Sequence, residues 1–266
     1  KGGMSRYNRY QIRALREIYN PKNIKVLSLS PPREGDFEDY FEVDWYAWGT
    51  SLFSKFFFVL RVIKEVYFWN PKYIWLGHIN FCEILVRFKL FNKVKSILNV
   101  YGLEVWSGLR PQVENGFRKI DFIISDCHFT ANYCINEGYR LSGSMEVIWD
   151  CVDLERFNNN VCDDQYNFYT RYNLPNPKVN PWILTLGRLS KSASHKGYER
   201  LIDTFSEISK KEEKCVLVFA GKGDMKEFLT QKAKDFDISE RVFFSGMVHE
   251  DDLPKFYRAS RVFSLV

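Results

Sequence analysis

The amino-acid sequence predicts an α/β protein with parallel sheets, divided into two domains. Short apolar runs rich in β-branched and aromatic residues alternate with segments whose apolar residues recur every three or four positions. The runs are typical of buried strands, and the periodic segments are typical of amphipathic helices. Regular alternation of the two favours open, mainly parallel sheets with helices on both faces. At 266 residues, the chain is long enough for two domains that each bury a core.

Composition narrows the class of protein. A chain that is 45% hydrophobic and 17% aromatic is not disordered. The net charge of +5 suits anionic substrates or a lipid surface, and it gives no reason to expect nucleic acid as a partner. The six cysteines form no CxxC pair, which favours reduced thiols and a cytoplasmic protein. The most apolar stretch, residues 52–69, is interrupted by charged residues and does not resemble a membrane span. No cluster of His, Cys, Asp or Glu predicts a metal site.

The first half begins with Gly2 and Gly3, followed by a periodic segment at residues 4–18 that predicts a helix. A Gly-Gly turn before a helix N-terminus lets the backbone approach a phosphate or sugar, so both glycines are candidate ligand contacts. In parallel sheets, ligands bind beyond the carboxyl ends of the strands. Further along, the pattern predicts strands at residues 25–29, 73–76, 94–100, 120–125 and 146–149, and helices at 52–68, 80–90 and 129–137.

Arginines recur along the first predicted helix, at Arg6, Arg9, Arg13 and Arg16. Their spacing of three or four residues places them on one side of the helix. Two interpretations stay open. The stripe is either a solvated face or a surface that contacts anionic lipid headgroups, as in proteins bound peripherally to membranes.

A polar segment separates the two halves. Residues 158–181 are rich in Asn and Pro and show no periodicity, which favours an interdomain connection. The sequence therefore predicts a first domain at residues 1–157, a linker at 158–180 and a second domain at 181–266.

The second domain opens with the most informative stretch of the chain. An apolar run predicts a buried strand that ends at Gly187, and a periodic segment beginning near Leu201 predicts a helix. The loop between them contains Arg188 and Lys196, with no acidic residue between the two. Cations at a strand end, beside a helix N-terminus, form a site for a diphosphate. A surface loop with two solvated cations is the alternative.

The next predicted strand, residues 216–219, is followed by the turn Ala220-Gly221-Lys222-Gly223-Asp224. A Gly-rich turn between a strand and a helix also begins a dinucleotide-binding fingerprint, so an NAD-type oxidoreductase is an alternative function. Lys226 stands where the third glycine of that fingerprint belongs, and the acidic residue expected about 20 residues later at a strand end is absent. The fingerprint is therefore incomplete.

In their order, these pieces resemble family 4 of the glycosyltransferases, the retaining group 1 enzymes with two Rossmann-like domains (the GT-B architecture). The pattern of Gly-Arg, a polar loop and Lys-Gly is similar to the family's donor loop. Residues 241–248, RVFFSGMV, resemble its RV-F-G-(F/M)-V strand, and residues 253–265 resemble its L-x-x-x-Y-x-x-A-x-x-F segment.

This resemblance implies transfer of a sugar from a nucleotide-sugar donor to a glycan, lipid or small-molecule acceptor. It further implies retention of configuration, with no cofactor and no metal. The catalytic candidates are Arg188 and Lys196. The donor-binding candidates are Gly2, Gly3, Gly187, Gly221, Met247 and Val248.

The first domain supplies the candidates for contact with the sugar or acceptor. Residues 101–104, YGLE, are similar to the family's H-G-x-E segment, with a tyrosine in place of the histidine. The remaining candidates lie at the ends of predicted strands. The full set is His78, Tyr101, Glu104 and Ser125.

Relative to the family, the sequence begins at the Gly-Gly loop and stops before a segment with two glutamates that hold the donor. The resemblance therefore implies a fragment that lacks the first strand and the glutamate segment, and we expect it to be poorly active. A sugar-binding protein that has the fold but no turnover is a third interpretation.

Overall fold

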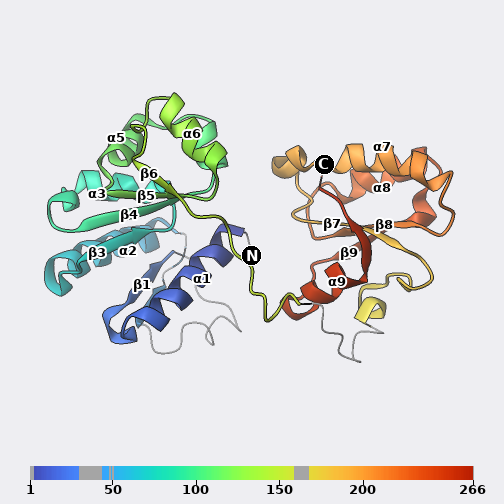
Figure 1. Ribbon diagram of the computed structural model, residues 1–266, viewed down its shortest axis with the longest axis horizontal. Coiled ribbons are helices and arrows are strands. Elements are labelled where there is room, and N and C mark those ends of the chain that lie inside the picture. The colour runs from blue at the N-terminus through green and yellow to red at the C-terminus, as the bar shows by residue number, and fades with distance from the viewer. Residues whose placement is uncertain (1–2, 30–43, 48, 50, 159–167, 266) are drawn as a thin grey trace. The chain divides into compact units, whose positions relative to one another are not determined.

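A computed structural model describes the chain except for residues 1–2, 30–43, 48, 50, 159–167 and 266. The chain divides into two compact units, Lys1–Cys151 and Val152–Val266. Each unit contains a four-stranded parallel sheet with helices packed against it (Figure 1). The predicted fold class, α/β with parallel sheets in two domains, is confirmed.

The sheet of the first unit has the strand order β3-β4-β5-β6, with every neighbouring pair parallel. Because the strands are parallel, their carboxyl ends lie at one edge of the sheet. Two further strands pair with each other as a separate parallel sheet. The strands are β1 (Lys25–Ser28), β2 (Asp44–Ala47), β3 (Tyr73–Leu76), β4 (Lys95–Val100), β5 (Phe122–Ser125) and β6 (Met145–Val147).

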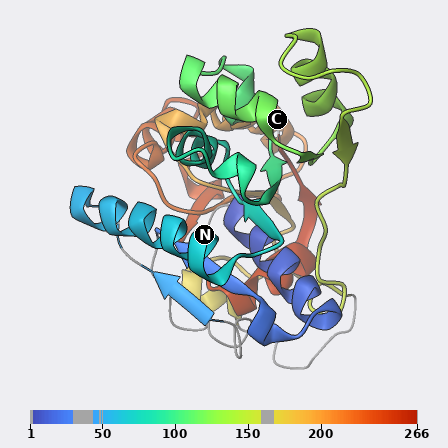
Figure 2. The ribbon, with the colours of Figure 1, turned by 90° about the vertical axis from the view of Figure 1, so that its left-hand side faces the viewer.

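The helices of the first unit pack on a core that includes Leu85, Leu98 and Phe117, all fully buried. The helix expected at residues 80–90 is broken into three short pieces, and α5 was not predicted from the sequence. Figure 2 shows α2, in light blue, projecting beyond the strands of its own unit. The helices are α1 (Gly3–Ile18), η1 (Pro21–Asn23), α2 (Leu52–Lys64), η2 (Glu65–Trp69), η3 (Ile79–Phe81), α3 (Cys82–Arg87), η4 (Leu90–Asn92), α4 (Leu103–Trp106), α5 (Pro111–Lys119) and α6 (His128–Asn136).

The second unit has the strand order β10-β7-β8-β9, again all parallel. Its strands are β7 (Trp182–Leu186), β8 (Val216–Ala220), β9 (Val242–Gly246) and β10 (Ser260–Phe263). Every residue of β8 is buried, as expected for a strand covered on both faces. Its helices are η6 (Phe168–Tyr172), η7 (Lys191–Lys196), α7 (Tyr198–Ser209), α8 (Lys226–Asp235), η8 (Ser239–Arg241), η9 (Glu250–Asp252) and α9 (Leu253–Ala259).

Two apolar clusters cover the two faces of this sheet. Ile202, Phe205 and Leu229 belong to the cluster formed with α7 and α8. Trp182 and Phe256 belong to the other, on the side where α9 packs. Figure 1 shows α7 and α8 together on one side of the sheet and α9 on the opposite side. The sheet is thereby fixed between two helical layers, and its carboxyl edge is left for a site.

Part of the segment expected to be a linker is packed into the second unit. Phe168 and Leu174 are buried, and the ring of Phe168 contacts those of Trp182 and Phe256. The indole N–H of Trp182 donates to the carbonyl of Pro175 at 3.1 Å. The polar composition of residues 158–180 concealed these few apolar anchors. Residues 159–167 of the predicted linker lie outside the described residues.

Among the described residues, no helix is both long enough and apolar enough to cross a membrane.

Candidate functional site

The candidate site lies at the carboxyl edge of the sheet in the second unit, where the loops after β7, β8 and β9 meet. The N–H of Gly187 donates to the carbonyl of Ala220 at 2.9 Å, and the N–H of Gly221 donates to that of Gly246, also at 2.9 Å. The N–H of Leu189 donates to the carbonyl of Lys222 at 3.0 Å. These backbone bonds continue the strand pairing past the strand ends, so the three loops form one connected surface.

Two glycines make this close approach of loops feasible. A Cβ on Gly221 would lie 1.8 Å from the carbonyl oxygen of Gly187, and its φ of +146° is also unfavourable for other residues. A Cβ on Gly223 would lie 1.8 Å from the carbonyl oxygen of Leu189. The Gly-rich turn is therefore needed for contact between two segments of the chain. Direct contact of Gly221 with a donor stays a prediction.

Lys196 lies against Gly187. A Cβ on Gly187 would be 2.9 Å from the Lys196 Nζ and 2.6 Å from the Tyr198 hydroxyl. The Tyr198 hydroxyl in turn donates to the carbonyl of Arg188 at 3.2 Å, and the tyrosine is buried. The Tyr198 hydroxyl therefore contacts the backbone of Arg188 and lies close to the ammonium of Lys196. The sequence analysis did not identify this tyrosine as a site residue.

The charges at this edge are unbalanced. In the part of the chain that the structure describes, neither Arg188 nor Lys196 forms an ion pair with an acid. The same holds for Lys222, an exposed lysine whose Cε lies 3.9 Å from where a Cβ on Gly246 would be. The lysine between the two glycines of the turn was the sequence signal for this third cation. Together, the three side chains make the edge locally cationic.

Helix α7 begins at this cationic edge. Its N-cap is Gly197, in the left-handed conformation with φ +67°, and no side chain caps the first turn. The first N–H groups of a helix have no partner within the helix and, with the helix dipole, favour an anion. Glu199 is the acidic residue of that first turn. The position of Arg188 and Lys196 beside the start of α7 suits an anion, and binding of a diphosphate there stays a prediction.

The loop after β9 contains Met247 and Val248, the residues expected near a nucleotide base. Met247 is 62% exposed, whereas Val248 packs on the apolar cluster of Trp182 and Phe256. The N–H of His249, directly after them, donates to the Tyr172 hydroxyl at 3.0 Å. This contact fixes the end of the loop.

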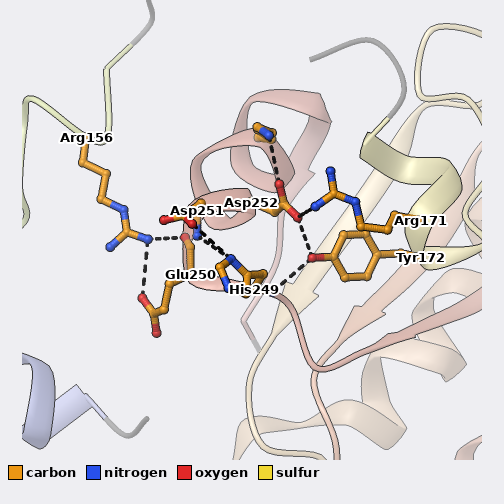
Figure 3. Close-up of polar contacts among 8 residues, drawn as sticks. Arg156, Arg171, Tyr172, His249, Glu250, Asp251 and Asp252 are labelled. Atoms are coloured by element: carbon orange, nitrogen blue, oxygen red, sulfur yellow. Dashed lines mark hydrogen bonds and ion pairs between the residues drawn. The ribbon is translucent and has the colours of Figure 1, made fainter. Parts of the chain in front are cut away.

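Tyr172 is itself anchored to a buried carboxylate (Figure 3). Its hydroxyl donates to Asp252 at 2.7 Å, and Arg171 and Lys255 donate to the same carboxylate at 3.0 and 2.9 Å. Burial raises the pKa of Asp252, but the hydrogen bond from Tyr172 and the Lys255 and Arg171 charges outweigh it, so the pKa lies below its usual value. Nearby, Arg156 hydrogen-bonds to the backbone and carboxylate of Glu250. This network joins η6 to η9 and was not predicted.

The candidate residues of the first unit lie at the ends of neighbouring strands, but most have local partners. His78 Nδ1 accepts from the N–H of Asn80 at 3.2 Å at the start of η3. Glu104 accepts from the N–H of Tyr101 at 2.6 Å. The Ser125 hydroxyl donates to the carbonyl of Cys127 at 2.9 Å. These contacts give His78, Glu104 and Ser125 structural roles at loops and helix starts, and their contact with a sugar or acceptor stays a prediction.

Tyr101 belongs to a wider polar network. Its hydroxyl donates to Asn8 of α1 at 2.5 Å and accepts from Asn99 at 3.2 Å. The Asn99 amide also donates to Gln11 at 2.5 Å and accepts from the Trp75 indole at 3.1 Å. Burial raises the pKa of Tyr101, which keeps the hydroxyl protonated. An asparagine within an apolar strand was the only sequence signal for this network.

The remaining candidates are the two N-terminal glycines. Gly2 lies outside the described residues. Gly3 is the first residue of α1, and a Cβ there would meet nothing within 4 Å. Among the described residues, no group of three or more His, Cys, Asp and Glu side chains could hold a metal ion.

Fold and site together define an α/β protein with a cationic loop at the carboxyl edge of a parallel sheet. Residues 170–265 match the family described as glycosyl transferases group 1. This match confirms the predicted resemblance to group 1 glycosyltransferases for this part of the chain.

Curated relatives agree with the family. Mannosylfructose-phosphate synthase from Agrobacterium fabrum is 36% identical over 91 residues, or 31% of this chain and 19% of that protein. GDP-mannose-dependent alpha-(1-6)-phosphatidylinositol monomannoside mannosyltransferase from Mycobacterium tuberculosis is 24% identical over 196 residues, or 72% of this chain and 49% of that protein. The chain thus spans between a fifth and a half of the length of these relatives.

Solved structures share the fold along almost the whole chain. Anabaena Alr3699/HepE in complex with UDP-glucose aligns with a TM-score of 0.76 at 14% identity, covering 100% of this chain and 71% of that one. Sucrose-phosphate synthase from Thermosynechococcus elongatus aligns with a TM-score of 0.72 at 14% identity, covering 98% and 69%. These likenesses confirm the predicted GT-B class of fold, with its two Rossmann-like domains.

Proposed function

We propose that the protein transfers a sugar from a nucleotide-sugar donor to an acceptor, with retention of configuration and without a bound metal. The observation that supports this most directly is the cationic edge of the second unit. Arg188 and Lys196 have no acidic partner among the described residues, and the uncapped start of α7 adjoins Lys196 through Gly197. Such an arrangement suits a diphosphate better than a neutral ligand.

The chemistry requires positive charge at this position. When the bond between the anomeric carbon and the diphosphate oxygen breaks, negative charge grows on the leaving diphosphate. Without a metal, the protein must supply the compensating positive charge itself. The groups that carry this charge must be oriented before the reaction begins. In this proposal, Lys196 and Arg188 contact the diphosphate and stabilise its charge more strongly in the transition state than in the bound donor.

The donor's base would contact the backbone of Met247 and Val248, in the loop that the Tyr172 hydroxyl fixes through His249. The comparisons support a nucleoside diphosphate sugar, since one structural neighbour was solved with UDP-glucose and one relative is named for its use of GDP-mannose. The acceptor would be a glycan, lipid or small molecule, and Tyr101 is one candidate for its contact in the first unit. We place the protein in the cytoplasm, and an anionic membrane surface stays a proposed partner.

Ligand-dependent thermal unfolding tests this proposal against its rivals. We expect UDP or GDP to raise the melting temperature and NADH to leave it unchanged. A shift with NADH alone would favour the NAD-type oxidoreductase. A shift with a nucleotide sugar, but no release of nucleoside diphosphate with any acceptor, would favour a sugar-binding protein of the same fold.

A further inference from the structure

The outer side of α2 and η2 in the first unit is apolar and largely aromatic. Phe58, Val62 and Val66 point into the core, and Ser51 caps the start of α2 by accepting from the N–H of Ser54. The residues of the opposite side recur at helical spacing and are 45–84% exposed. We call these residues the aromatic face: Leu52, Phe53, Phe56, Phe57, Leu60, Tyr67 and Phe68.

The aromatic face continues into a hollow beside α3. The hollow has a volume of about 450 Å³, with Phe56 and Leu60 on its α2 side and Ile84 and Phe88 on its α3 side. Isolated exposed apolar residues are ordinary, but a contiguous patch of large ones marks an interaction surface. The face is therefore expected to be covered by a partner.

Cations surround this surface. Lys55 and Arg87 line the hollow, and Lys64 is exposed one helical turn beyond Leu60. None of these three side chains forms an ion pair with an acid within the described residues. Lys93 lies over the ring of Tyr67, with its Nζ 5.7 Å from the ring centre.

The nearby acids are already occupied. Glu83, which also lines the hollow, pairs with Arg110 at 3.5 Å. Glu65 is buried and pairs with Lys25 and Arg61 at 2.8 and 2.6 Å. The surface thus combines apolar rings with an excess of positive charge.

The charge decides between candidate partners. A second copy of this chain, bound symmetrically, would place the same cationic patch against itself, which is repulsive. A bilayer with anionic lipids is complementary to both the apolar rings and the positive charge. Phenylalanine and leucine side chains enter the boundary of the acyl chains, while lysine and arginine side chains contact lipid phosphates.

We propose that the aromatic face, with Lys55, Lys64 and Arg87, docks the protein on an anionic membrane surface. The proposal makes the membrane partner of the proposed function specific, and it does not depend on sugar transfer. It also differs from the arginine stripe on α1. There, Arg6, Arg9, Arg13 and Arg16 all have interactions within the protein, one of them a 3.9 Å ion pair between Arg13 and Glu17.

Co-sedimentation with lipid vesicles tests the proposal. The chain should bind vesicles that contain phosphatidylglycerol, bind pure phosphatidylcholine vesicles weakly, and lose affinity as salt rises. The combined substitution Phe53→Ser, Phe56→Ser and Phe57→Ser should weaken binding by about 100-fold, because three rings no longer leave water. Lys55→Glu with Lys64→Glu should abolish the preference for anionic lipid.

The matched control is Leu141→Ser, which removes an apolar side chain that is 81% exposed elsewhere in the first unit. It should bind vesicles like the original chain. Nucleoside diphosphate binding, measured on every variant, should be unchanged, which separates loss of docking from misfolding and from failure of the proposed function.

Absence of binding to phosphatidylglycerol vesicles by the original chain would overturn the proposal. So would equal binding by the triple serine variant. A concentration-dependent dimer that the triple variant loses, without any vesicle binding, would assign the face to a second copy instead.

Discussion

The ammonium of Lys196 lies against Gly187, 2.9 Å from the position that a Cβ on that glycine would take. Glycine at the end of β7 therefore gives space to the cation that the proposed reaction needs. The neighbouring Tyr198 hydroxyl lies 2.6 Å from the same position, so it also needs the space that glycine leaves. The absence of a Cβ on Gly187 thus leaves room for both side chains.

Replacement of this glycine tests the relationship. We expect Gly187→Ala to weaken nucleoside diphosphate binding about tenfold, because one charge-assisted hydrogen bond is misplaced. Global stability should also fall, because the new Cβ would lie 2.6 Å from the hydroxyl of the buried Tyr198, which must shift. Isothermal titration of a double-mutant cycle decides the matter, because Gly187→Ala should have no further effect once Lys196→Ala is present. Additive effects would show that the two residues act separately.

Gly221 is a stronger constraint, because its neighbour is backbone. Gly221→Ala would place a Cβ 1.8 Å from the Gly187 carbonyl oxygen and should lower the free energy of unfolding by roughly 3 kcal/mol or more. The control is Gly143→Ala, where φ is +73° but nothing lies within 4 Å, and about 1 kcal/mol is expected. Urea unfolding measures both. Equal losses would mean that the contact between the two loops is not as close as described.

Tyr172 should position the base-binding loop without touching the diphosphate. Tyr172→Phe removes the hydroxyl that joins Asp252 to the N–H of His249, while the ring contact with Phe256 remains. We expect UDP or GDP to bind about tenfold more weakly and inorganic diphosphate to bind as before. A parallel loss for inorganic diphosphate would indicate general disruption of the second unit.

Asp252 should make stability depend on pH. Its carboxyl has a lowered pKa in the folded protein, so its stabilising contribution is present above the unfolded value of about 3.9 and is lost as pH falls through the folded value. Asp252→Asn should cost roughly 1–3 kcal/mol at pH 7, because Tyr172, Lys255 and Arg171 lose a charged acceptor. The difference between the two proteins should shrink below about pH 4. A difference that stays constant down to pH 2 would rule out this carboxylate as its source.

Local pattern was enough to predict much of the second unit. The strand that ends just before Gly187, the cationic loop and the amphipathic helix from Tyr198 are all encoded in neighbouring residues. The fold class followed from the same alternation of strands and helices. In these segments, periodicity, turn residues and charge all indicate the same structure.

Contacts between distant residues could not be predicted in this way. Tyr172 and Asp252 are 80 residues apart, and nothing near either of them indicates the other. The polar composition around Phe168 concealed its burial, because a single aromatic residue gives no period. Glu104 was recognised as a candidate, but its bond to the N–H of Tyr101 depends on the sharp turn at Gly102, with φ +112°. Sequence pattern predicts which elements form, and long-range side-chain partners decide how loops are held.

The central claim is that Arg188 and Lys196 form a specific diphosphate site, and isothermal titration of UDP and GDP tests it most directly. Arg188→Ala and Lys196→Ala should each weaken binding roughly 10- to 100-fold, since a charge-assisted hydrogen bond contributes about 1.5–3 kcal/mol. Lys191→Ala is the matched control, because it removes an exposed lysine of the same loop whose anchor to Asp224 is its backbone N–H. It should bind as the original chain does. Equal losses of affinity in all three variants would show that the nucleotide responds only to the overall positive charge of the loop. That result would contradict the account.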